Sequence, residues 1–175
     1  MNLKALLNRG FSKEKRDEVV SYLTNNPEKM TKLMDLFYSE ESMTTQYAAW
    51  VVGSLGEKQP EMLAPFLPKM FKTMQKQECT EAIFRNSFRI FQYQSIPEEL
   101  EAPLFDLSLR ILSNKERAVA TKVFAMTTAL NIVKKTPELK NELRLVVENV
   151  LPYGSPGIKS RGKKVLYSLE KIKPA

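Results

Sequence analysis

Apolar residues recur along the chain at spacings of three and four, the period of a helix that buries one face. After Pro60 they fall at Leu63, Phe66, Leu67, Met70, Phe71 and Met74, and comparable stripes follow Pro97 and Pro137. No Asn-Gly or Asp-Gly pair separates runs of alternating polarity, the pattern expected of hairpin strands. The sequence therefore predicts an all-α fold.

A Pro-Glu pair opens four of these stripes, at Pro27, Pro60, Pro97 and Pro137. Proline suits the first position of a helix because its missing N–H would have no partner there, and glutamate beside it meets the positive end of the helix dipole. The intervals between the prolines are 33, 37 and 40 residues, the length of a helical-hairpin repeat. Each pair therefore predicts the start of a repeat's second helix, within about three residues of the proline.

Each repeat also requires a first helix ahead of its Pro-Glu pair. The apolar stripes place these helices at residues 13–24, 43–57, 80–94 and 118–135, with a final helix at 156–172. Helix 118–135 is apolar on more than one side, as expected of a helix packed between neighbours. Pro65, Pro68 and Pro103 are expected to shift or kink the starts of the second helices. The expected organisation is a single domain over residues 1–175, built from about four helical hairpins and a C-terminal capping helix.

The stretch QYAAWVVGSLGEKQPEMLAPFLPKM, residues 46–70, resembles a HEAT-like repeat. Its first helix carries small residues, a short turn follows, and a proline opens a second helix with leucines. The resemblance covers residues 13–172 and implies a right-handed α-α superhelix of the HEAT-like and armadillo-like class. Proteins of that class are generally scaffolds, so the resemblance implies a non-enzymatic module that presents an extended helical surface to a protein partner.

Composition limits the chemistry further. The chain has no histidine and one cysteine, Cys79, which excludes histidine-based triads and Cys/His zinc sites, and it contains no glycine-rich phosphate loop. We therefore expect no enzyme activity, no cofactor and no metal, and we expect Cys79 to be structural. The short apolar runs, the lack of a signal-peptide core and the single cysteine predict a cytoplasmic protein with no membrane partner.

The charge distribution keeps a nucleic-acid-binding alternative open. The net charge is +7, but the second-helix segments 28–41, 61–78, 98–116 and 138–148 carry 9 basic and 14 acidic residues. Because second helices usually line the concave face of HEAT arrays, that face is expected to be neutral to acidic. The alternative interpretation of the resemblance is that the chain is a nucleic-acid-binding protein related to HEAT-repeat DNA repair glycosylases. Those enzymes clasp a lesion with several tryptophans and a carboxylate, whereas this chain has only Trp50.

The sequence provides two candidate sites. The first is a basic patch at the C-terminal end, Lys159, Arg161, Lys163 and Lys164, expected on the exposed side of helix 156–172 as either a solvated cap or a site for anions or nucleic acid. The second is a surface groove formed by Tyr47, Trp50, Arg85 and Arg89. The two arginines could hold an anion or pair with Glu81 and neighbouring carboxylates, and the aromatic pair could form a platform or fill the core. The partner's identity and the oligomeric state are left open.

Overall fold

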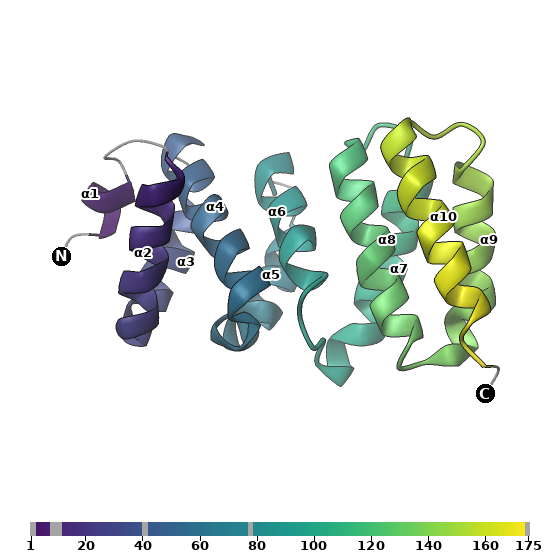
Figure 1. Cartoon of the computed structure of the whole chain (residues 1–175), viewed down its shortest axis with the longest axis horizontal. Helices are drawn as coiled ribbons and strands as arrows, with labels where there is room; N and C mark the ends of the chain where they lie inside the picture. The colour runs from purple at the N-terminus through teal and green to yellow at the C-terminus, as the bar shows by residue number, and fades with distance from the viewer. Residues whose placement is uncertain (1–2, 8–11, 40–41, 77–78, 174–175) are drawn as a thin grey trace. The chain divides into compact units, whose positions relative to one another are not determined.

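The computed structural model describes residues 3–7, 12–39, 42–76 and 79–173, and within these ranges the regular elements are α-helices and short 3₁₀ turns (Figure 1). Two compact units divide the chain, Met1–Gln94 and Ser95–Ala175. The first holds α1 (Leu3–Leu7), α2 (Lys13–Asn25), α3 (Met30–Phe37), α4 (Ser42–Lys58), α5 (Leu67–Met74) and α6 (Glu81–Phe91). The second holds α7 (Glu98–Ser113), α8 (Val119–Val133), α9 (Lys140–Val150) and α10 (Pro156–Glu170). The all-α prediction is confirmed, and the single domain over residues 1–175 stays a prediction.

The first helix of each repeat lies where the apolar stripes placed it. Helices α2, α4, α6, α8 and α10 begin and end within three residues of the predicted bounds. Two of them begin with a side-chain cap, since Ser12 Oγ accepts a hydrogen bond from Lys15 N at 3.2 Å and Thr80 Oγ1 accepts one from Ile83 N at 3.3 Å. These caps satisfy amides that have no partner inside the helix. Helix α1 was not predicted.

Three of the four Pro-Glu pairs form a 3₁₀ turn that leads toward the second helix. The turns are Pro27–Lys29, Pro60–Met62 and Pro137–Leu139. The residue before each proline has nearly the same non-helical backbone, for example φ −138°, ψ 64° at Asn26 and φ −144°, ψ 63° at Gln59. This agrees with the exclusion of a pre-proline residue from the helical region. At the fourth pair Pro97 is the N-cap and α7 begins directly at Glu98. The prediction of a second-helix start within about three residues of the proline is confirmed at Pro27, Pro97 and Pro137, whereas α5 begins seven residues after Pro60.

The additional prolines act differently in the two second helices that contain them. After Pro60 a second 3₁₀ turn, Ala64–Phe66, intervenes, and α5 begins only at Leu67. Pro65 and Pro68 lack the amide hydrogens that an earlier start would use, so the predicted shift is confirmed there. Pro103 was expected to shift or kink the start of its helix, and there is no shift, because α7 begins at Glu98 and runs through Pro103. At the sixth helical position Pro103 removes one intrahelical hydrogen bond without delaying the start.

Each unit has its own apolar core. In the first unit α4 packs against α3 and α6, and the largest fully buried side chains include Phe37, Leu55, Phe88 and Phe91. In the second unit α8 packs against α7, α9 and α10, which confirms its prediction as a helix between neighbours. Because packed helices of this kind are rigid on the scale of a side chain, they hold surface residues in fixed relative positions.

Candidate functional site

A groove on the first unit runs along α4 and α6. It has a volume of about 560 Å³ and is lined by Thr45, Gln46, Ala49, Trp50, Ala82, Arg85, Asn86 and Arg89. All eight residues belong to the two helices, which are the first helices of successive repeats. Trp50, Arg85 and Arg89, which the sequence placed in one candidate groove, lie together here.

The two arginines project from α6 one helical turn apart. Arg85 is exposed, whereas Arg89 is half-buried. The guanidinium of Arg89 lies against α4, where a Cβ on Gly53 would be 3.0 Å from Nη1 and 3.1 Å from Cζ. Within the described residues neither arginine forms an ion pair, and no ion pair joins Glu81 to Arg85. The groove therefore presents two cationic groups that no described carboxylate neutralises.

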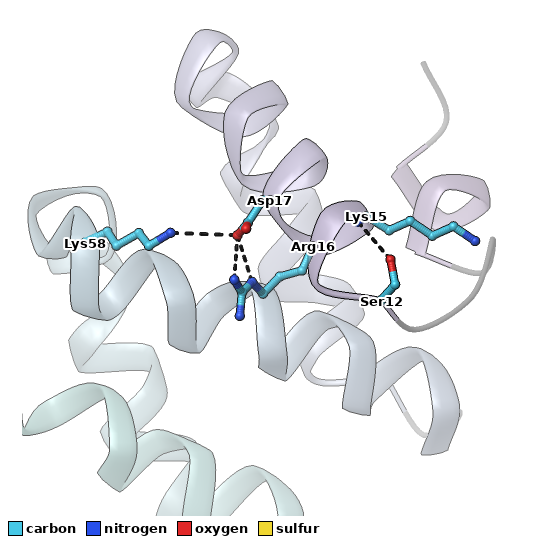
Figure 2. Close-up of polar contacts among 5 residues, drawn as sticks. All are labelled: Ser12, Lys15, Arg16, Asp17 and Lys58. Atoms are coloured by element: carbon cyan, nitrogen blue, oxygen red, sulfur yellow. Dashed lines mark hydrogen bonds and ion pairs between the residues drawn. The ribbon is translucent and has the colours of Figure 1, made fainter.

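Trp50 lies between this groove and α2. The Arg16 guanidinium of α2 stands 4.9 Å from the centroid of the Trp50 ring, within the range of a cation–π contact. Arg16 in turn donates hydrogen bonds to Asp17 Oδ1 from Nε at 3.0 Å and from Nη2 at 2.6 Å, and Lys58 Nζ lies 3.7 Å from the same oxygen (Figure 2). The hydrogen bond from Arg16 holds the pKa of Asp17 below its ordinary value. One face of the indole is thus covered by a fixed cation.

Tyr47, the fourth residue of the predicted groove, does not line it. Tyr47 lies half-buried in a small hollow of about 20 Å³, whose lining also includes Leu6, Ser12, Arg16 and Trp50. Tyr47 and Trp50 are three residues apart on α4, so their side chains point in directions about 60° apart around the helix axis. Tyr47 therefore faces α1 and α2, whereas Trp50 borders both hollows. Of the two aromatic residues, only Trp50 therefore lines the groove.

The basic residues at the C-terminal end are distributed around α10. Lys159, Lys163 and Lys164 are exposed, whereas Arg161, which was expected on the exposed side, is half-buried. Ile158, Gly162, Val165 and Leu169 form the buried face of the helix. At about 100° per residue, Lys159 and Lys163 lie on one flank of that face, and Arg161 and Lys164 lie on the other. The four cations are thus two pairs rather than one converging cluster.

The fold is that of a known family of helical repeats. The model of the HEAT repeat domain matches residues 3–169. This chain belongs to the HEAT repeat family. HEAT repeat domains generally act as scaffolds for protein interaction and are typically non-catalytic. Neither the curated proteins nor the solved structures compared with the chain include a match.

A further hollow among the described residues of this HEAT repeat domain was missed by sequence reasoning. It lies on the second unit, has a volume of about 700 Å³, and is lined by Leu112, Ser113, Lys115, Lys122, Asn149, Val150, Tyr153, Gly154 and Ile158. Its residues come from all four helices of the unit and from the loops between them, so no local pattern in the sequence could reveal it. None of the predicted basic-patch residues lines it.

The part of the chain that the structure describes holds neither a cluster of metal ligands nor a membrane-spanning helix. No group of three or more cysteine, aspartate or glutamate side chains there is arranged to hold a metal ion. Cys79 is half-buried, with Sγ 3.7 Å from the carbonyl oxygen of Thr80. No described helix combines the length and apolar character needed to cross a membrane. The expected absence of a metal or cofactor stays a prediction.

Proposed function

We propose that this HEAT repeat domain is a non-enzymatic module that binds a protein partner through the groove between α4 and α6. The observation that carries the proposal is the convergence of Trp50, Arg85 and Arg89 along two packed helices. Tryptophan and arginine are the side chains that most often dominate the energetics of protein interfaces. Here they stand on rigid elements rather than on loops, which lowers the entropy lost on binding.

The composition of the groove supports binding rather than catalysis. Its lining contains no carboxylate, cysteine or histidine, the groups that most often serve as general acids, bases or nucleophiles. Arginine remains protonated at all physiological pH values and does not exchange protons readily. The lining can therefore hold a ligand by charge, hydrogen bonds and apolar contact, and it offers no proton-transfer group.

The alternative partner, a nucleic acid, receives less support. A phosphate backbone is bound by cations that follow its path, whereas the exposed lysines of α10 are divided between two flanks. The groove itself has two arginines, and the single tryptophan is already covered on one face by Arg16. A protein partner therefore fits the described surface better.

A photo-crosslinking residue introduced at position 46 tests the proposal, because Gln46 is exposed and lines the groove. The matched control carries the same residue at position 153, where Tyr153 is 93% exposed on the second unit. After nuclease treatment of the cell extract, we expect a discrete crosslinked protein from position 46 only. That protein, once purified, should bind the full chain directly. A discrete crosslink from position 153 alone, or crosslinks that nuclease removes, would contradict the proposal.

A further inference from the structure

We infer that the groove recognises an acidic segment of its partner, in which two carboxylates on alternate residues of an extended stretch bind Arg85 and Arg89. This inference rests on the proposed function, because it specifies the chemistry of the partner at the same groove. It requires that the spacing, charge and remaining lining of the groove all suit such a segment.

The spacing follows from the helix. Arg85 and Arg89 are four residues apart on α6, so their Cβ atoms are about 5–6 Å apart on one face. In an extended chain, side chains two residues apart project from the same face at about 6.6 Å. An acidic-x-acidic segment can therefore present one carboxylate to each guanidinium, whereas adjacent acidic residues point to opposite faces.

The charges are complementary. The lining includes two cationic groups and no carboxylate, and neither arginine is neutralised by a described acidic residue. Guanidinium groups bind carboxylates with two parallel hydrogen bonds, which adds directional specificity to the charge attraction. Gly53 gives the Arg89 guanidinium room to lie against α4, so this cation lies close to both helices that form the groove.

The rest of the lining favours a peptide. Ala49, Ala82 and Trp50 provide an apolar strip beside the arginines, suited to an apolar residue near the acidic pair. The amides of Gln46 and Asn86 can hydrogen-bond to a peptide backbone, and Asn86 is fixed by a bond from Nδ2 to Ala82 O at 2.8 Å. Single-stranded nucleic acid is bound instead on free aromatic faces and a longer track of cations.

The experiment measures the fluorescence anisotropy of labelled peptides with the full chain. One peptide carries Glu-Val-Glu at its centre, a second carries Gln-Val-Gln, and a third carries Glu-Glu-Val with the same charge. We expect the first to bind about tenfold or more tightly than the second and severalfold more tightly than the third, since only the first offers a carboxylate to each arginine. Salt should weaken its binding.

Two double variants locate the binding. R85Q/R89Q should weaken binding of the Glu-Val-Glu peptide about tenfold or more, since it removes both charge-assisted contacts. K159Q/K163Q removes the same net charge from exposed positions on α10 and should change binding less than about twofold, since neither lysine lines the groove. Circular dichroism and thermal melting confirm that each variant folds.

Several outcomes would overturn the inference. These are equal binding of the Gln-Val-Gln peptide, equal loss in both double variants, and tighter binding of a single-stranded DNA of similar length at the same salt. If the wild-type chain associates with itself and R85Q/R89Q does not, the groove binds a second copy of the chain instead of a different partner. If position 46 crosslinks a protein whose binding survives R85Q/R89Q, the proposed function stands and the acidic segment is wrong. If the peptide binds as expected but position 46 crosslinks nothing, the proposed function fails instead.

Discussion

Gly53 on α4 and Arg89 on α6 fit together, because the arginine guanidinium fills the space that any side chain at position 53 would need. A Cβ there would lie 3.0 Å from Nη1 and 3.4 Å from Nε of Arg89. Glycine inside a helix lowers its stability by about 0.5–1 kcal/mol relative to alanine. This close approach gives a physical reason for glycine in the middle of α4.

Gly53→Ala should increase the stability of the protein while it weakens peptide binding. Arg89 can swing aside because the crowded atoms are the end of a flexible side chain, so the free energy of unfolding should rise by up to about 1 kcal/mol. The displaced guanidinium should bind the Glu-Val-Glu peptide several times more weakly. Urea denaturation and peptide anisotropy measure the two effects. Gly157→Ala, where a Cβ would meet Val119 Cγ1 at an ordinary 3.4 Å, is the control and should leave peptide binding unchanged.

Gly162→Val should destabilise the second unit. A Cβ at Gly162 would lie 2.8 Å from Leu151 Cδ2 and 3.3 Å from Val147 Cγ1, so a larger side chain would force α10 away from α9. Overpacking of this kind costs about 1–3 kcal/mol in the free energy of unfolding, measured by urea denaturation. Gly157→Val, at an exposed position of the same helix, should cost less. Equal unfolding midpoints for the two variants would show that this contact is not tightly packed.

Tyr38 should make stability depend on alkaline pH. Burial raises the pKa of Tyr38 above its ordinary value of 10.0. The contribution of the protonated Tyr38 hydroxyl to the free energy of unfolding is therefore fully present below pH 10. It is lost as the pH rises further, because Tyr38 ionises at a lower pH in the unfolded chain than in the folded one. The melting temperature of the wild type should consequently fall more between pH 9 and 11 than that of Tyr38→Phe. Tyr167→Phe, at a residue 60% exposed, should behave like the wild type.

The same substitution should be tolerated at neutral pH. The Tyr38 hydroxyl is buried without a hydrogen-bond partner among the described residues, and removal of an unsatisfied buried polar atom is neutral or stabilising. Tyr38→Phe at pH 7 should therefore match or exceed the wild type in urea denaturation. A loss of more than about 1 kcal/mol would show that the hydroxyl has a partner.

Lys135→Met should weaken the contact between the end of α8 and the start of α7. Lys135 Nζ donates hydrogen bonds to Ile96 O at 2.9 Å and to Glu101 Oε1 at 2.5 Å. The lysine is about half exposed, so we expect a loss of about 0.5–1.5 kcal/mol in the free energy of unfolding, reduced by high salt. Lys134→Met, at an exposed neighbouring lysine, should change stability less. Indistinguishable denaturation curves for the two variants would contradict this role.

Much of the fold could be predicted from the sequence because its determinants are local. The conformations before Pro27, Pro60 and Pro137 are restricted by the prolines themselves, and the apolar period fixes the buried face of each helix. Helix α1 was missed because Leu3, Leu6 and Leu7 span little more than one turn, too short for a period to be recognised. For Pro103 the sequence left a shift and a kink open, and only the shift is contradicted, since α7 begins at Glu98.

The candidate groove could be predicted only in part. Arg85 and Arg89 are one turn apart, so their shared face follows from sequence alone. The contact of Arg16 with Trp50 and that of Gly53 with Arg89 join separate helices, and no local spacing encodes them. Arg161 was expected to be exposed because it is close in sequence to three lysines. Four positions this close in sequence are distributed over more than half of the circumference of a helix, so they do not all face solvent.

Trp50 is the only tryptophan in the chain, and it lies in the first of the two compact units. Selective excitation of indole fluorescence therefore reports on Met1–Gln94 alone, while the circular dichroism of the helices reports on both units. If the two signals are lost at the same urea concentration, the chain unfolds as one cooperative body. If the fluorescence changes at a different concentration, each unit folds by its own core. The position of one indole thus lets an unlabelled protein reveal how far cooperativity extends along its repeats.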